Sequence, residues 1–154
     1  MRLPVIGCGG TLIHENWVLT AAHCCHAVRD HPARFKILKT IANEYLQTSL
    51  QGDEITKIPD QIIIHENFDP KSLDNDVCLL RFNSGFQIAK NEKIAVACLK
   101  EKGVEPPNGD RCFVAGWGTI GEGKEQSAVL QELAVNIIDR ELCNSNQIYR
   151  GAIR

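Results

Sequence analysis

The stretch "LTAAHCCH", residues 19–26, places two histidines around two adjacent cysteines. These residue types suit a metal site, a disulfide or the surroundings of a catalytic base. Four consecutive residues do not readily surround one tetrahedral ion, because neighbouring side chains point in different directions and no second spaced pair of ligands is evident. We therefore expect no metal or cofactor at His23, Cys24, Cys25 and His26, which leaves a disulfide and a catalytic base to be weighed.

A carboxylate that could accompany such a base is Asp76 in "LDNDVCLLRF", 53 residues after His23. Taken alone, Asp76 is explained by a polar turn, and His23 by a surface or structural histidine. In general, a histidine can accept a proton near neutral pH, and a carboxylate beside it can fix its tautomer. The residues alone do not show that the two side chains meet.

The elements that must position these residues are short. Apolar runs of strand length, rich in Val, Ile and Leu, are separated by turn residues: "GTLI", "WVLTA", "RFKILKTI", "QIIIH" and "DVCLLRF". Helix signals are weak. A polar segment with two prolines, residues 99–110, precedes two further strand-like runs, "CFVAGWG" and "LQELAVNII". Many short strands at this spacing favour an all-β barrel or sandwich.

Three motifs in order, "CGGTLIHENWVLTAAHC", "NDVCLLRF" and "VAGWGT", resemble the trypsin-like (chymotrypsin-fold, peptidase S1) serine proteases over nearly the whole chain. The resemblance implies an all-β, chymotrypsin-like fold of Greek-key β-barrels, truncated at both ends. Residues 1–98 would form the first barrel without its first strand, 99–110 a linker, and 111–154 the opening of the second barrel. Because a partial barrel exposes unpaired strand edges, we expect the isolated chain to be poorly stable or prone to aggregation.

The same resemblance implies a serine endopeptidase, a hydrolase in which His23 is the general base and Asp76 its orienting partner. In that family the nucleophilic serine lies in a Gly-Asp-Ser-Gly turn that also builds the oxyanion hole. None of the serines has such a turn around it: Ser49, Ser72, Ser84, Ser127 and Ser145. The resemblance thus implies that the sequence stops before the nucleophile and the primary specificity pocket, and we expect the chain alone to be inactive.

Seven cysteines in 154 residues indicate an oxidising compartment or metal binding. The resemblance pairs Cys8 with Cys24 beside the catalytic histidine. Cys25 and Cys78 each follow a proposed catalytic residue by two positions, so a second, non-standard disulfide between them is one interpretation and two buried thiols the other. The remaining cysteines match family positions whose partners would lie outside this chain: Cys98, Cys112 and Cys143.

Charge and hydropathy argue against nucleic acids and membranes as partners. The net charge is −2 without a basic run, which gives nucleic-acid binding no electrostatic support, and no apolar run approaches the ~20 residues of a membrane span. The start, "MRLPVIGCGG", is not a secretory signal, although the family and the cysteines imply a secreted, extracellular protein. If completed, the chain would meet protein or peptide substrates and protease inhibitors. The competing interpretations are a non-catalytic, protease-like binding module and a truncated product without its own activity.

Overall fold

The computed structural model describes residues 7–29, 38–49 and 52–152. The chain divides into two compact units, the first made of Met1–Glu44 with Leu50–Leu99 and the second of Tyr45–Ser49 with Lys100–Arg154. The domain limits expected from the sequence remain a prediction. In both units the described residues form mostly strands and few helices, as predicted for an all-β protein, and these strands do not close into a barrel.

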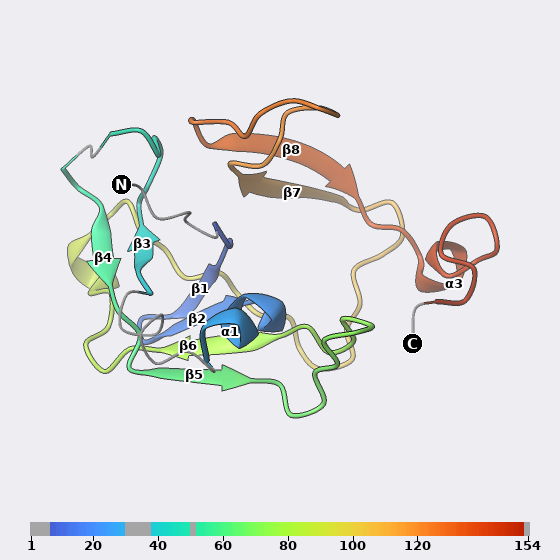
Figure 1. Ribbon diagram of the computed structural model, residues 1–154, viewed down its shortest axis with the longest axis horizontal. Helices are drawn as coiled ribbons and strands as arrows, with labels where there is room; N and C mark the ends of the chain where they lie inside the picture. The colour runs from blue at the N-terminus through green and yellow to red at the C-terminus, as the bar shows by residue number, and fades with distance from the viewer. Residues whose placement is uncertain (1–6, 30–37, 50–51, 153–154) are drawn as a thin grey trace. The chain divides into compact units, whose positions relative to one another are not determined.

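The first unit contains a four-stranded antiparallel sheet in the order β1-β2-β6-β5 (Figure 1). Its strands coincide with apolar runs singled out in the sequence: β1 Thr11–His14, β2 Trp17–Thr20, β5 Gln61–Ile64 and β6 Cys78–Arg81. A separate antiparallel pair joins β3 Thr40–Ala42 to β4 Ile55–Lys57, and a short 3₁₀ helix, η1, spans Ile88–Lys90. In β6 the side chains of Cys78 and Leu80 are buried on one face and that of Leu79 is half-buried on the other, which explains why this strand is continuously apolar.

The core of this unit lies under the two central strands. Val18 of β2 is paired with Leu80 of β6, and both side chains are buried. Phe82 and Phe86 extend this cluster, with their ring centroids 5.0 Å apart in an edge-to-face arrangement. Because alternate residues of a strand share a face, the pairing that buries Val18 and Leu80 also fixes which residues follow at the strand ends.

Helix α1, Ala22–Arg29, begins directly after β2 and was not predicted from the sequence. Eight residues are too few for a stable isolated helix, so tertiary contacts must hold it. Ala22 and Cys25 are its buried side chains, and both belong to the core cluster. The first turn of α1 contains His23, so the packing that stabilises this helix also positions the candidate base.

The second unit is a hairpin with little core. β7 Arg111–Gly116 pairs antiparallel with β8 Gln131–Asn136, and a single turn of helix, α3 Arg140–Cys143, follows with Asp139 as its N-cap. The segment Tyr45–Ser49 is hydrogen-bonded beside this hairpin. No side chain is buried in the described part of this unit. Among the described residues, no helix is both long enough and apolar enough to cross a membrane.

Candidate active site

The register of β2 against β6 brings the two candidate residues together. The last pair of that ladder is Thr20 with Cys78. His23 follows Thr20 by three residues, and Asp76 precedes Cys78 by two. In an antiparallel pair the end of one strand lies beside the start of the other, so both residues emerge at the same end of the sheet.

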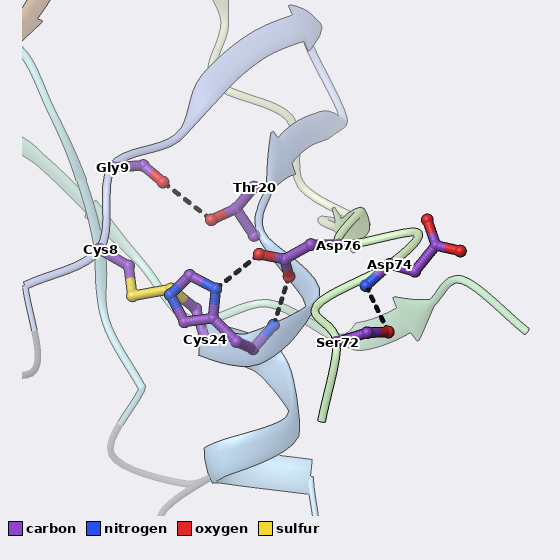
Figure 2. Close-up of polar contacts among 8 residues, drawn as sticks. Cys8, Gly9, Thr20, Cys24, Ser72, Asp74 and Asp76 are labelled. Carbon is purple, nitrogen blue, oxygen red and sulfur yellow. Dashed lines mark hydrogen bonds and ion pairs between the residues drawn. A yellow bond between two sulfur atoms is a disulfide. The ribbon is translucent and has the colours of Figure 1, made fainter. Parts of the chain in front are cut away.

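One carboxylate holds His23 at two points. Oδ2 of Asp76 lies 2.7 Å from Nδ1 of the His23 ring, and Oδ1 accepts a hydrogen bond of 2.7 Å from the His23 backbone N–H (Figure 2). That N–H belongs to the first turn of α1, where no carbonyl of the helix itself is available to accept it. The His23 side chain is 55% exposed and that of Asp76 24% exposed, so the ring is supported on one side and open to solvent on the other.

Asp76 is aimed by a tight turn before β6. Leu73 and Asn75 both have left-handed backbone conformations, with φ of 58° and 55°. Asparagine tolerates this conformation better than most residues. The Asn75 side-chain amide donates to the carbonyl of Asn67 at 3.1 Å, and the Val77 N–H donates to the carbonyl of Asn75 at 2.7 Å. These bonds reverse the chain so that the residue between Asn75 and Val77 faces α1.

Two disulfides flank the pair. Cys8 is bonded to Cys24 and Cys25 to Cys78, the two pairings named from the sequence (Figure 2 shows the first). Cys25 and Cys78 are 2% and 1% exposed, so their bond lies inside the core and ties α1 to β6. Cys24 Sγ lies 3.4 Å from Nε2 of His23, the ring nitrogen opposite Asp76. The remaining cysteines are free thiols: Cys98, Cys112 and Cys143.

None of the serines among the described residues hydrogen-bonds to His23 through its hydroxyl. The hydroxyls of Ser72 and Ser127 donate to Asp69 and to the Val129 carbonyl, and that of Ser84 accepts from Lys57. Ser145 is half-buried, and its Oγ atom is shielded from solvent without a hydrogen-bond partner among the described residues. His26, the other histidine of the opening motif, has its ring 6.0 Å from that of Phe68. The described residues therefore bring the candidate base and the candidate carboxylate together, and no described serine hydroxyl is hydrogen-bonded to His23.

Comparison with known proteins decides the family. The sequence model of the family described as Trypsin matches residues 3–154. The chain belongs to the trypsin family. It is 35% identical over 140 residues to serine protease 57 of Rattus norvegicus, covering 90% of this chain and 48% of that protein. It is 37% identical over 147 residues to transmembrane protease serine 11C of Mus musculus, covering 95% and 32%.

Granzyme M of Rattus norvegicus is a further relative of this trypsin-family chain, 31% identical over 146 residues, covering 95% of the chain and 54% of that protein. The chain thus spans about half the length, or less, of the curated relatives it matches. The resemblance stated from the three sequence motifs is confirmed, and with it the chymotrypsin-like, all-β fold class.

In this trypsin-family chain, the pKa of the Asp76 carboxyl is shifted from its ordinary value. Partial burial raises the pKa of Asp76, but the hydrogen bonds from the His23 ring and backbone, the charge of His23 and a bond from the Ala22 backbone together outweigh it. The net effect is a pKa below the ordinary value for an aspartate. Stabilisation of the ionised form is what an orienting carboxylate requires, because a protonated Asp76 would offer His23 one acceptor fewer.

The lowered pKa of Asp76 predicts how the stability of the folded chain depends on pH. Since the pKa of Asp76 is lower in the folded chain than the ~3.9 of an unfolded aspartate, its contribution to the free energy of unfolding is full above about pH 5 and is lost as the pH falls through the folded value. Urea denaturation of the chain and of Asp76→Asn should therefore show a stability difference that shrinks between about pH 5 and pH 2. Asp74→Asn is the matched control, because among the described residues the Asp74 carboxylate accepts a hydrogen bond from the Asn75 N–H and makes none to His23. A difference that stays constant over this range contradicts the assignment.

Proposed function

We propose that the chain supplies the histidine and aspartate of a serine endopeptidase site. With its proton on Nδ1, His23 donates to Asp76 Oδ2, and the lone pair of Nε2 is available to accept the proton of a serine hydroxyl. Asp76 then stabilises the imidazolium that forms. The observation that carries the proposal is the pair of hydrogen bonds that Asp76 makes to the ring and to the backbone N–H of the same histidine.

The roles of these residues in hydrolysis follow from this geometry. The base takes the proton as the serine oxygen attacks the peptide carbonyl, and returns it to the leaving amine when the acyl-enzyme forms. The same atoms then activate water to release the acyl group. Because no serine of this chain lies in a Gly-Asp-Ser-Gly turn, we propose that the 154-residue chain is inactive alone and that a serine must come from a longer chain or another segment.

The proposal also covers the class of substrate and the cellular location of the protein. Membership of the trypsin family supports protein or peptide substrates, with protease inhibitors as further partners of a completed site. Two disulfides, one of them accessible at Cys8, support an oxidising environment outside the cytosol. We accordingly place the protein in the secretory route or outside the cell.

The inactivity is tested with the purified chain and a panel of peptide esters, which react more readily than amides. We expect no turnover above that of His23→Ala, and no labelling by a fluorophosphonate, which reacts with an activated serine. Turnover or labelling of the parent chain that disappears in His23→Ala would show that one of its own serines serves as nucleophile.

The base–carboxylate assignment is tested separately, by the tautomer of the neutral His23 ring. Long-range ¹H–¹⁵N spectra above pH 8 should show the proton on Nδ1 in the parent chain and on Nε2 in Asp76→Asn, because an amide NH₂ at the Oδ2 position donates instead of accepting. The same tautomer in both proteins would show that Asp76 does not orient the ring.

A further inference from the structure

We propose that reduction of the Cys8–Cys24 disulfide converts this corner of the molecule into a zinc site, with Cys8, His23 and Cys24 as ligands. Among the described residues, these three form the group whose potential ligand atoms all lie within 4.8 Å of one another. Two thiolates and an imidazole are ligands that Zn²⁺ prefers, and three protein ligands leave a fourth tetrahedral position for water. Cys8 supplies the distant ligand that the four consecutive residues 23–26 lack among themselves.

The distances fit such an ion. In a tetrahedral site with Zn–S of ~2.3 Å and Zn–N of ~2.0 Å, nitrogen and sulfur ligands lie about 3.5 Å apart. Nε2 of His23 and Sγ of Cys24 are 3.4 Å apart already. Cleavage of the bond between the two sulfurs lets them separate to a comparable spacing. Cys8 and His23 are exposed and Cys24 is half-buried, so that both reductant and metal have access.

The hydrogen bond to Asp76 prepares His23 for this role. A metal-binding histidine usually donates its other ring N–H to a carboxylate, which fixes the tautomer and makes the ligating nitrogen more basic. Asp76 occupies this position at Nδ1, 2.7 Å away, and leaves Nε2 facing the sulfurs. The second bond of Asp76, to the His23 backbone, holds ring and carboxylate together whether the disulfide is closed or open.

The redox step is a thiol–disulfide exchange. A dithiol reductant transfers two electrons and two protons to the Cys8–Cys24 bond, which yields two thiols, and becomes a disulfide itself. Each thiol loses its proton when Zn²⁺ binds, while His23 binds in its neutral form. The Cys25–Cys78 disulfide is buried, so that a limited amount of reductant should open the accessible bond first.

Zinc at this position would occupy Nε2, the atom that the proposed function assigns to proton transfer, and only this consequence rests on the proposed function. A reducing, zinc-containing environment would then block the base. The binding itself is measured by spectroscopy without any substrate, so that failure of the zinc site and failure of the hydrolytic assignment are distinguished.

The experiment uses the full 154-residue chain with Cys98, Cys112 and Cys143 changed to serine, so that no other free thiol competes. After limited reduction with a dithiol and its removal without air, alkylation and peptide mass mapping should show Cys8 and Cys24 free and Cys25–Cys78 intact. Titration with Co²⁺ should then give one ion per chain, with thiolate charge-transfer and tetrahedral d–d absorption, which Zn²⁺ displaces. The oxidised chain should give neither band. Equal binding by the oxidised chain, or no binding by the reduced one, overturns the proposal.

Variants identify the ligands. His23→Ala and Cys24→Ser should each weaken Co²⁺ binding by more than tenfold, and Asp76→Asn by about 10- to 100-fold through loss of the supporting carboxylate. His26→Ala, on the same helix, is the matched control and should bind as the parent does. Zinc X-ray absorption of the unmutated reduced site should show two sulfur ligands and a nitrogen, which requires no variant to fold. Four sulfur ligands, or binding unchanged in His23→Ala, would contradict the site.

Discussion

In a longer form of this chain that continues through a Gly-Asp-Ser-Gly turn, Asp76→Asn is expected to lower kcat for peptide hydrolysis by about 10⁴-fold. The value of KM should change little, because the substitution leaves the groups that bind substrate in place. The measurement is steady-state hydrolysis of a peptide amide, with the active-site concentration determined by a serine-directed titrant.

The expected loss follows from the way Asp76 is bonded. Its Oδ1 accepts the His23 backbone N–H, and an asparagine can retain this bond only through its carbonyl oxygen. The amide NH₂ then takes the place of Oδ2, 2.7 Å from Nδ1 of the ring, and donates to it. The proton of the neutral ring moves to Nε2, which can no longer accept a proton from serine. The fold survives while the base is in the wrong tautomer.

Two comparisons make this prediction specific. Asp74→Asn changes a carboxylate in the same turn whose side chain bonds the Asn75 N–H and not His23, so kcat should stay within a few-fold of the parent. The double variant of His23→Ala with Asp76→Asn should be hardly slower than His23→Ala, since the two residues act as a unit. A kcat within tenfold of the parent for Asp76→Asn would show that the carboxylate is dispensable.

The apolar runs of the sequence predicted the strands of the four-stranded sheet and of the β7–β8 pair, whereas β4 lies in no run that was singled out. Strands such as β2 and β6 are visible because buried strands are apolar, short and bounded by turn residues. His23 and Asp76 were singled out by a resemblance in motif order, which the family match confirms. Their contact depends on the register of Thr20 against Cys78, a long-range pairing that no local pattern encodes.

What the sequence did not show depends on tertiary contacts. Helix α1 has weak helical character, and the core contacts of Ala22 and Cys25 hold it. Tyr45–Ser49, within the residues assigned to the first barrel, is hydrogen-bonded beside strands of the second unit. The short distance between the His23 ring and Cys24 arises because a helix turn and a disulfide meet there. In each case a tertiary contact decides the structure, and the local sequence around the residues involved gives no sign of that contact.

The second large effect is expected from the Cys25–Cys78 disulfide. This bond joins residues 53 apart, and in the chain-entropy model its loss raises the entropy of the unfolded chain by the equivalent of about 4 kcal/mol. The Cys8–Cys24 bond joins residues 16 apart, for which the same model gives about 3 kcal/mol. The difference should widen in practice, because Cys25 and Cys78 also fill the core and their replacement by alanine leaves unfilled space.

Paired alanine variants measure this ranking. The chain with both Cys25→Ala and Cys78→Ala should unfold at a lower urea concentration than the chain with both Cys8→Ala and Cys24→Ala, or be unfolded without urea, because the parent chain is itself expected to be only marginally stable. Cys112→Ala removes a free thiol from the hairpin of the second unit and controls for cysteine replacement as such. Because the buried bond links α1 to the start of β6, its loss should also weaken the His23–Asp76 contact, which the ring spectra report. If the accessible pair proves the more stabilising, the core does not depend on the bond between α1 and β6, and packing around Val18, Leu80 and Phe82 must hold the helix instead.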